Sequence, residues 1–135
     1  MTANHRPAFG RLLPLVAIAL IAVAGCSRSD RPALGGVSGT VTLDGVPLPA
    51  ALVVFTPDGP GRSAVATTDT AGRYELAYLR DIAGADVGSH TVRITTAGEE
   101  GRSKEILPAR YHAKTQLVAA VAPGDNTIDF PLESK

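Results

Sequence analysis

Hydrophobic positions follow two different patterns on either side of residue 26. Residues 12–24 are apolar almost without interruption, whereas apolar and polar residues alternate in short runs from Val37 onward. A period of two places successive side chains on opposite faces of a β-strand. Short alternating runs with turn signals about every 8–12 residues are typical of an all-β sandwich or barrel. The pattern therefore predicts an apolar N-terminal segment followed by one β domain.

Seven strands are predicted in this domain, and the fold class is expected to be all-β. The strands are expected at residues 37–43, 51–56, 63–68, 73–78, 89–96, 116–121 and 127–132. In the fifth of these, His90, Val92 and Ile94 share one face and are expected to point into the core. Residues 51–56 are continuously apolar and are expected to be buried on both faces. No capped amphipathic helix is predicted after Cys26.

Turn residues separate the predicted strands. The dipeptide Asp44-Gly45 predicts a tight hairpin, and Gly45 and Gly72 are expected to supply positive φ angles. Asp69 is expected to accept backbone N–H bonds within its own turn. Tyr74 is expected to pack its ring into the sandwich while its hydroxyl reaches the rim. Loops are expected at residues 57–61, 81–88 and 97–105, the last of them charged and solvated.

The N-terminus has the composition of a secretory signal peptide. Arg6 and Arg11 precede the apolar run, and residues 1–25 contain no acidic residue. The run has 13 residues, whereas a helix that spans a bilayer needs about 20. A signal-peptide helix is therefore predicted rather than a permanent membrane span.

The end of this segment, Val23-Ala24-Gly25-Cys26, resembles the lipobox of bacterial lipoproteins. The resemblance implies cleavage between Gly25 and Cys26 and attachment of palmitate-type acyl chains to Cys26. The protein would then be exported and anchored to the bacterial membrane, on its periplasmic or cell-surface side. Ser27 follows the cysteine where an aspartate would favour the inner membrane, so the resemblance favours the outer one. A plain signal peptide with an incidental cysteine is the alternative.

Three segments make up the predicted organisation of the chain. Residues 1–25 form the lipoprotein signal peptide, and residues 26–36 form the lipidated cysteine and a flexible tether rich in polar, proline and glycine residues. Residues 37–133 form the β-sandwich domain.

Five segments of this domain resemble the carboxypeptidase regulatory-like domain. They are Val37-Ser38-Gly39-Thr40-Val41, Asp44-Gly45-Val46-Pro47-Leu48-Pro49-Ala50-Ala51, Val53-Val54-Phe55, Thr68-Asp69-Thr70-Ala71-Gly72-Arg73-Tyr74 and Gly88-Ser89-His90-Thr91-Val92-Arg93-Ile94. The resemblance implies a transthyretin-like (prealbumin-like) Greek-key sandwich of seven strands in a mostly non-catalytic family. Residues 107–111 and 126–130 further resemble small lipoproteins of planctomycete-type bacteria.

Charge and chemistry exclude several classes of function. The chain has 13 Lys+Arg and 13 Asp+Glu, and removal of Arg6 and Arg11 leaves 11 against 13, a net charge of −2. This balance argues against a nucleic-acid partner. One cysteine cannot form an internal disulfide or a cysteine-based metal site. We expect no cofactor, no metal and no enzymatic activity, with His90 structural and His112 solvated.

The leading hypothesis is a non-catalytic, lipid-anchored module of the cell envelope with a structural or binding role. Its expected partners are the membrane, through the lipid, and an unidentified envelope protein or glycan. The alternative is a carbohydrate- or peptide-binding accessory to an envelope enzyme or transporter, which exposed aromatic rings at Tyr78 or Tyr111 would favour. An enzyme would require His90 and His112 to converge with an acidic residue.

Overall fold

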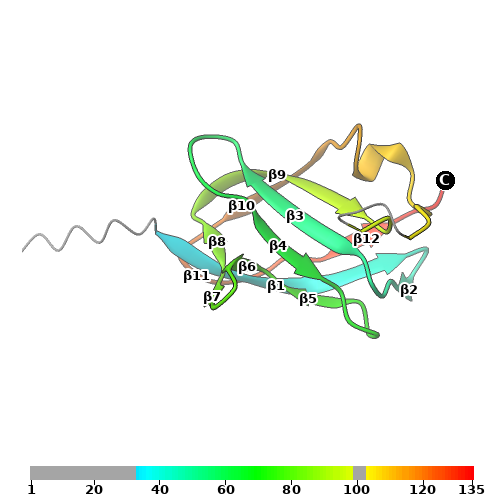
Figure 1. Ribbon diagram of the computed structural model, residues 1–135, viewed down its shortest axis with the longest axis horizontal. Helices are drawn as coiled ribbons and strands as arrows, with labels where there is room; N and C mark the ends of the chain where they lie inside the picture. Colours follow the sequence, from blue (N-terminus) through cyan, green and yellow to red (C-terminus); the bar gives the residue numbers. More distant parts are fainter. Residues whose placement is uncertain (1–32, 99–102) are drawn as a thin grey trace, which may run out of the picture.

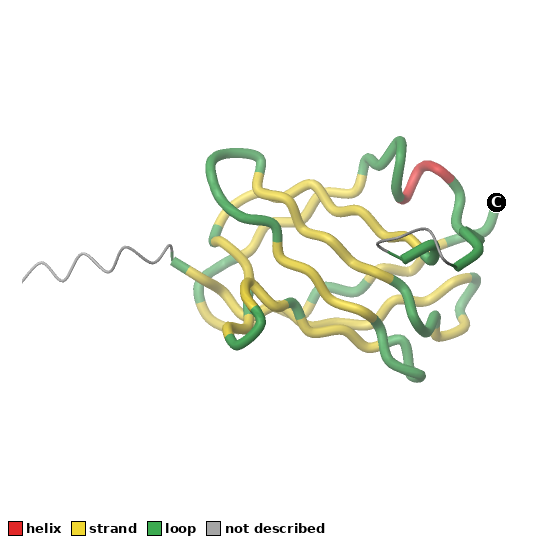
Figure 2. Tube along the Cα trace, viewed as in Figure 1, coloured by secondary structure: helices red, strands yellow, loops and turns green. Residues whose placement is uncertain are grey.

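The chain forms a β-sandwich of two packed sheets in a computed structural model that describes residues 33–98 and 103–135 (Figures 1 and 2). A single 3-10 turn, η1 (Ala109–Tyr111), accompanies the strands in this part of the chain. The strands are β1 (Leu34–Leu43), β2 (Val46–Pro47), β3 (Leu52–Pro57), β4 (Ala64–Thr67), β5 (Arg73–Glu75), β6 (Ala77–Leu79), β7 (Ile82–Ala83), β8 (Ala85–Asp86), β9 (Gly88–Thr95), β10 (Leu117–Val121), β11 (Gly124–Thr127) and β12 (Phe130–Leu132).

The first sheet is organised around β1, which runs along its whole length (Figure 1). On one side, β11 pairs in parallel with residues 35–38 and β12 with residues 41–43. On the other side, β8, β5 and β2 pair antiparallel with the beginning, middle and end of β1. The first strand therefore holds five others in place.

The second sheet has the order β10-β9-β3-β4-β6-β7 and is antiparallel throughout. Its centre is the pairing of β3 with β9, in which Val53 lies opposite Ile94 and Phe55 lies opposite Val92. These four side chains are fully buried, because both strands turn the same apolar face towards the first sheet.

The core between the sheets is apolar and aromatic. Phe55 contacts Phe130 edge to face, with 6.0 Å between ring centroids, and the Tyr74 ring centroid lies 6.1 Å from that of Phe130. These rings join the second sheet to β12 and β5 of the first. Each fully buried Val, Leu, Ile or Phe side chain contributes about 1.5–3 kcal/mol to folding. The core strands also confirm that His90, Val92 and Ile94 share the inward face of β9.

The turn between β1 and β2 follows from its two residues. Asp44 and Gly45 both have positive φ angles, +52° and +83°, and Leu43 lies directly opposite Val46. A two-residue hairpin with two positive φ angles matches the right-handed twist of its strands, and Asp-Gly is a favoured pair for it. The Asp44 carboxylate then accepts hydrogen bonds from the hydroxyl and the N–H of Ser134, which lower its pKa. The hairpin thereby fixes the C-terminal segment.

The domain begins earlier than residue 37. Leu34, Gly35 and Gly36 belong to β1, so the part of the expected tether that the structure describes includes strand residues. Glycine is required here by close packing, since a Cβ on Gly36 would lie 2.8 Å from the Asp125 carboxylate. The glycines that resemble a linker in the sequence thus allow β11 to approach β1.

The prediction that residues 51–56 are buried on both faces is wrong. Val53 and Phe55 are fully buried, but Leu52 and Val54 are only partly covered. A two-layer sandwich covers only one face of each sheet, so the outer face of β3 stays partly exposed although β4 and β9 flank the strand.

Two expected strands are each divided in two. Residues 73–79 form β5 in the first sheet and β6 in the second, with the fully buried Leu76 at the crossing. The strand expected at residues 127–132 is interrupted at Ile128 and Asp129: β12 holds its last three residues, and β11 consists of Thr127 and the three residues before it, which were expected to form a turn. The expected loop at 81–88 similarly contains the short strands β7 and β8. Alternation continues through such crossings, and the sequence pattern therefore does not reveal them.

Replacement of Gly39 tests the packing around β1. A Cβ at this position would clash with the Ile128 carbonyl group and would lie 3.0 Å from the Tyr74 ring. We expect Gly39→Ala to lower the free energy of unfolding by about 1–3 kcal/mol, the usual cost of overpacking, in urea denaturation. Gly59→Ala is the matched control, because nothing lies within 4 Å of its Cβ position. Equal stability of the two variants would contradict the described packing.

Candidate functional site

An open polar groove crosses the outer face of the first sheet. It has a volume of about 680 Å³ and is lined by residues that include Ser38, Thr40, Arg73, Glu75, Thr127 and Asp129. A pocket of about 320 Å³ shares Ser38 and Glu75 with it and adds Asp125 and Asn126. Hydroxyl and carboxylate groups predominate, with Arg73 as the cation. Such a lining can exchange hydrogen bonds with a polar ligand.

The register between β1 and β5 places the groove residues side by side. Ser38 lies opposite Glu75, and Thr40 lies opposite Arg73. Directly opposed residues of an antiparallel pair point to the same face, so each hydroxyl stands beside a charged group. The residues between them point inward, as the burial of Tyr74 shows. The alternating sequence of β1 and β5 therefore builds the groove on one face and the core on the other.

Asp129 and Tyr74 fix the floor of the groove. The Asp129 carboxylate accepts a hydrogen bond of 2.8 Å from the Thr40 N–H, at the point where β1 passes from β11 to β12. The Tyr74 hydroxyl donates to the Ile128 carbonyl. Burial, together with the nearby charge of Asp129, raises the pKa of Tyr74, so its hydroxyl remains a neutral donor. Both side chains are occupied by hydrogen bonds within the domain, so the other residues of the lining are the ones that can contact a ligand.

Asp69 and Gly72 form the turn at the rim of the groove. The Asp69 carboxylate accepts bonds of 2.9 Å from the N–H groups of Ala71 and Arg73, as in an Asx turn. Gly72 has a φ of +74°, donates its N–H to the Asp69 carbonyl, and accepts a bond from the Val41 N–H. The structure thus brings Asp69, Gly72 and Tyr74 together, whereas Gly45 lies in the β1–β2 hairpin.

Gly25 and Cys26, the predicted cleavage and lipidation positions, lie outside the described residues. Their roles stay predictions. The first strand starts at Leu34, eight positions after Cys26.

His90 and His112 each bond a main-chain carbonyl near them in the sequence. His90 is fully buried, packs 5.6 Å from the Phe55 ring, and donates from Nε2 to the Asp86 carbonyl at 2.7 Å. His112 is partly buried and donates from Nε2 to the Leu107 carbonyl at 3.1 Å. The two rings thus have separate hydrogen-bond partners.

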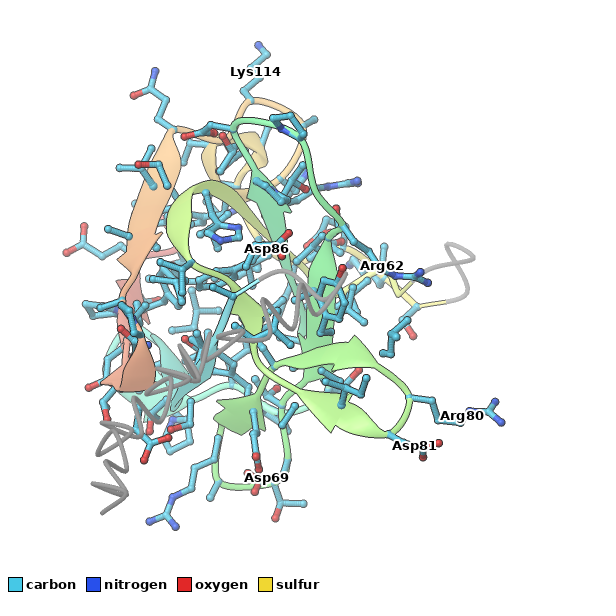
Figure 3. The ribbon with its side chains drawn as sticks, turned by 90° about the vertical axis from the view of Figure 1, so that its left-hand side faces the viewer. Arg62, Asp69, Arg80, Asp81, Asp86 and Lys114 are labelled. Atoms are coloured by element: carbon cyan, nitrogen blue, oxygen red, sulfur yellow. The ribbon has the colours of Figure 1, made fainter. Side chains whose placement is uncertain are left out.

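Asp86 is a buried carboxylate at the end of the sandwich where β1 begins. Figure 3 shows it near the middle of that end view, with Arg80, Asp81 and Lys114 at the periphery. Its Oδ2 accepts a bond of 3.1 Å from the Arg62 N–H. Asp86 Oδ1 and His90 Nδ1 are buried polar atoms for which the described residues provide no hydrogen-bond partner. Sequence reasoning placed Asp86 in a loop and gave no signal of this burial.

The two tyrosines whose exposure would favour a binding accessory, Tyr78 and Tyr111, differ in exposure. Tyr111 is buried, its hydroxyl accepts a bond of 2.9 Å from the Glu133 N–H, and the Arg110 guanidinium lies 4.8 Å above its ring. Tyr78 is partly exposed on β6. Tyr111 therefore acts as a structural residue that holds the C-terminal segment.

Within residues 33–98 and 103–135, no group of three or more histidine, cysteine, aspartate or glutamate side chains is arranged to hold a metal ion. The same residues contain no helix that is long and apolar enough to span a membrane.

Glu105 has a structural role that the sequence did not indicate. Its carboxylate accepts hydrogen bonds from the Thr95 hydroxyl, from both the N–H and the hydroxyl of Thr96, and from the Leu107 N–H. Burial opposes ionisation, but these bonds outweigh it and lower the pKa of Glu105 to about 2. The interpretation of residues 97–105 as simply a solvated loop is therefore wrong at Glu105, which fastens the loop to the end of β9.

Comparisons with known proteins add a distant likeness to solved structures. No protein-family model and no curated protein matches the chain. Among solved structures, a DUF3823 family protein from Parabacteroides merdae is similar, with a TM-score of 0.48 and 14% sequence identity over 75% of this chain. The match covers 46% of that protein, so the chain spans about half of its length. The all-β assignment rests on the sheets described above.

The Glu105 bonds predict how stability depends on pH. Because its pKa is about 4.5 in the unfolded chain and about 2 in the folded one, ionised Glu105 stabilises the fold above about pH 4.5. This stabilisation is lost as the pH falls towards 2. We expect Glu105→Gln to lower the melting temperature at pH 7 and to flatten its decline between pH 5 and 2. Glu133→Gln, at an exposed carboxyl, is the control; identical pH profiles for both variants would exclude the role of Glu105.

Proposed function

We propose that this protein is a non-catalytic, lipid-anchored β-sandwich module of the bacterial cell envelope with a structural or binding role. The observation that carries the proposal is the Val23-Ala24-Gly25-Cys26 segment, placed eight positions before the first strand of an all-β domain. After cleavage, Cys26 would be the N-terminal residue and the only cysteine of the mature chain. Two or three acyl chains give stable anchoring at about 0.8 kcal/mol per buried methylene.

The short connection limits how far the domain can stand from its anchor. Eight residues span at most about 29 Å when fully extended. Leu34, at the start of β1, would therefore lie within that distance of the membrane surface. Outer-membrane attachment, on its periplasmic or cell-surface side, is part of the proposal and is favoured by Ser27, which stands where an aspartate would favour the inner membrane.

A transthyretin-like Greek-key sandwich of the carboxypeptidase regulatory-like type, in a planctomycete-type lipoprotein, is the proposed family assignment. Joining β5 to β6 and β11 to β12, and setting aside the two-residue strands β2, β7 and β8, leaves seven strands. Their positions correspond to the seven predicted from the sequence. This correspondence supports the assignment.

The absence of catalysis is also a proposal. It is supported by the fully buried ring of His90 and by the separate carbonyl partners of His90 and His112. A general base needs its proton-accepting nitrogen within reach of a substrate.

Substitution of Cys26 tests the anchor. We expect Cys26→Ser to block signal cleavage by the lipoprotein route and to move most of the protein out of the detergent-extracted lipoprotein fraction. Metabolic labelling with an alkyne fatty acid, followed by partition in Triton X-114, measures both effects. Ser27→Ala is the matched control and should be labelled and partitioned like the parent chain. Unchanged labelling and partition of Cys26→Ser would contradict the proposal.

The polar groove favours a second candidate function, the binding of an envelope glycan or peptide. Paired hydroxyl and charged groups at Ser38–Glu75 and Thr40–Arg73 match the hydrogen-bonding groups of such ligands.

We expect Arg73→Ala combined with Glu75→Ala to weaken co-sedimentation with purified envelope glycan by about tenfold, from the loss of one to two hydrogen bonds. Arg93→Ala, an exposed charge on the other sheet, should bind like the parent. Equal binding by all three proteins, or binding by none, would remove this candidate.

A further inference from the structure

The edges of the two sheets are protected in all but one place. Unprotected edge strands present free N–H and C=O groups and tend to pair with another strand. In the described part of the chain, β2 contains Pro47, β12 contains Pro131, and β11 carries Asp125 and ends at the Ile128–Asp129 break, while β5 has three residues and β8 has two. At the far edge of the second sheet, β7 has two residues and an irregular register. Short length, proline, charge or irregularity thus limits pairing at each of these edges.

The remaining edge, β10, has none of these features. It is five residues long, has regular pairing with β9 along its whole length, and contains neither a charge nor a proline. Val118 is 75% exposed, more than any other large hydrophobic residue in the described segments. One side of its main chain bonds to β9, and no strand of residues 33–98 or 103–135 covers the other. The strand is therefore suited to extend the sheet by one more strand.

The sequence of β10 is compatible with pairing to itself. An antiparallel pair centred on Ala119 places Leu117 opposite Val121 of the second copy and Val118 opposite Ala120. All five residues are then paired, and residues of the same face meet: Leu117, Ala119 and Val121 on the inner side, Val118 and Ala120 on the outer. No charges face each other, because β10 contains no charged residue.

We propose that β10 is a homodimer interface at which a second copy of this chain adds its own β10, antiparallel, to form one continuous sheet. The contact is isologous, with the two-fold axis passing between the two Ala119 residues and perpendicular to the sheet. The uncharged edge disfavours a charged peptide as occupant and suits an identical strand.

The proposed membrane anchor, on which this part of the inference rests, fits the same symmetry. Two identical chains on one membrane are related by an axis along the membrane normal, so the extended sheet would lie parallel to the membrane. Antiparallel pairing places the two Leu34 residues at opposite ends of the dimer and at equal heights. A reach of up to about 29 Å lets both chains attach. Confinement to one surface raises the effective concentration, which favours pairing through so small an interface.

Disulfide trapping of the full-length protein in bacterial membranes tests the interface. Directly opposed residues of an antiparallel pair have Cα atoms about 4.5–5.5 Å apart, within the range of a disulfide. Under mild oxidation with copper phenanthroline, we expect Ala119→Cys to form a covalent dimer in most of the protein. Val118→Cys combined with Ala120→Cys, both at exposed positions, should do the same and covers the case in which Ala119→Cys does not fold.

Three controls make the result specific. Val65→Cys, exposed but inside the sheet, and Ala83→Cys, on the opposite edge, should remain monomeric. Ala120→Lys added to Ala119→Cys should abolish the dimer while the melting temperature stays within about 2 °C. Absence of the dimer in both β10 variants, an equal yield in the controls, or crosslinking to a different protein would overturn the proposal. Partition of the parent chain tests the anchor alone, and its oxidation shows whether Cys26 itself forms a crosslink. Failure of the anchor can therefore be distinguished from failure of the interface.

Discussion

The structure depends on the hydrogen bonding of one ten-residue strand. β1 pairs with β11 and β12 on one side and with β8, β5 and β2 on the other. The close packing at Gly35, Gly36 and Gly39 leaves no room for a side chain on these residues. Without β1, the other strands of the first sheet would have no partner in the described part of the fold. Its pairing with β11 and β12 joins the two ends of the domain, and such non-local contacts form slowly during folding.

Much of the fold could be predicted, because alternation of apolar and polar residues shows directly which side chains of a strand face the core. The inward face of β9, the Asp44-Gly45 hairpin and the Asp69 turn are all encoded within a few residues. The parallel pairing of β1 with β11 and β12 could not be predicted, because it depends on residues about 90 positions apart. The division at Leu76 was also hidden, since alternation continues while the strand changes sheets.

The candidate site was harder to predict from the sequence than the fold. The groove depends on the register of β1 with β5, which places Ser38 opposite Glu75. Neither residue has a signature that distinguishes it from an ordinary outward-facing strand residue. Glu105 shows the same limit, because a carboxylate in a charged segment gives no sign that four donors converge on it. Cys26 is the opposite case, since its signal is contained in four consecutive residues.

The proposed function gives β1 a second role as the point where the tether meets the domain. A strand bonded on both sides resists a pull along its axis better than an edge strand would. The most direct measurement is intact-mass spectrometry of the protein purified from its native membrane. The account predicts a chain that starts at Cys26 and carries two or three acyl groups. A chain that retains residues 1–25, or a Cys26 with an unmodified thiol, would contradict it.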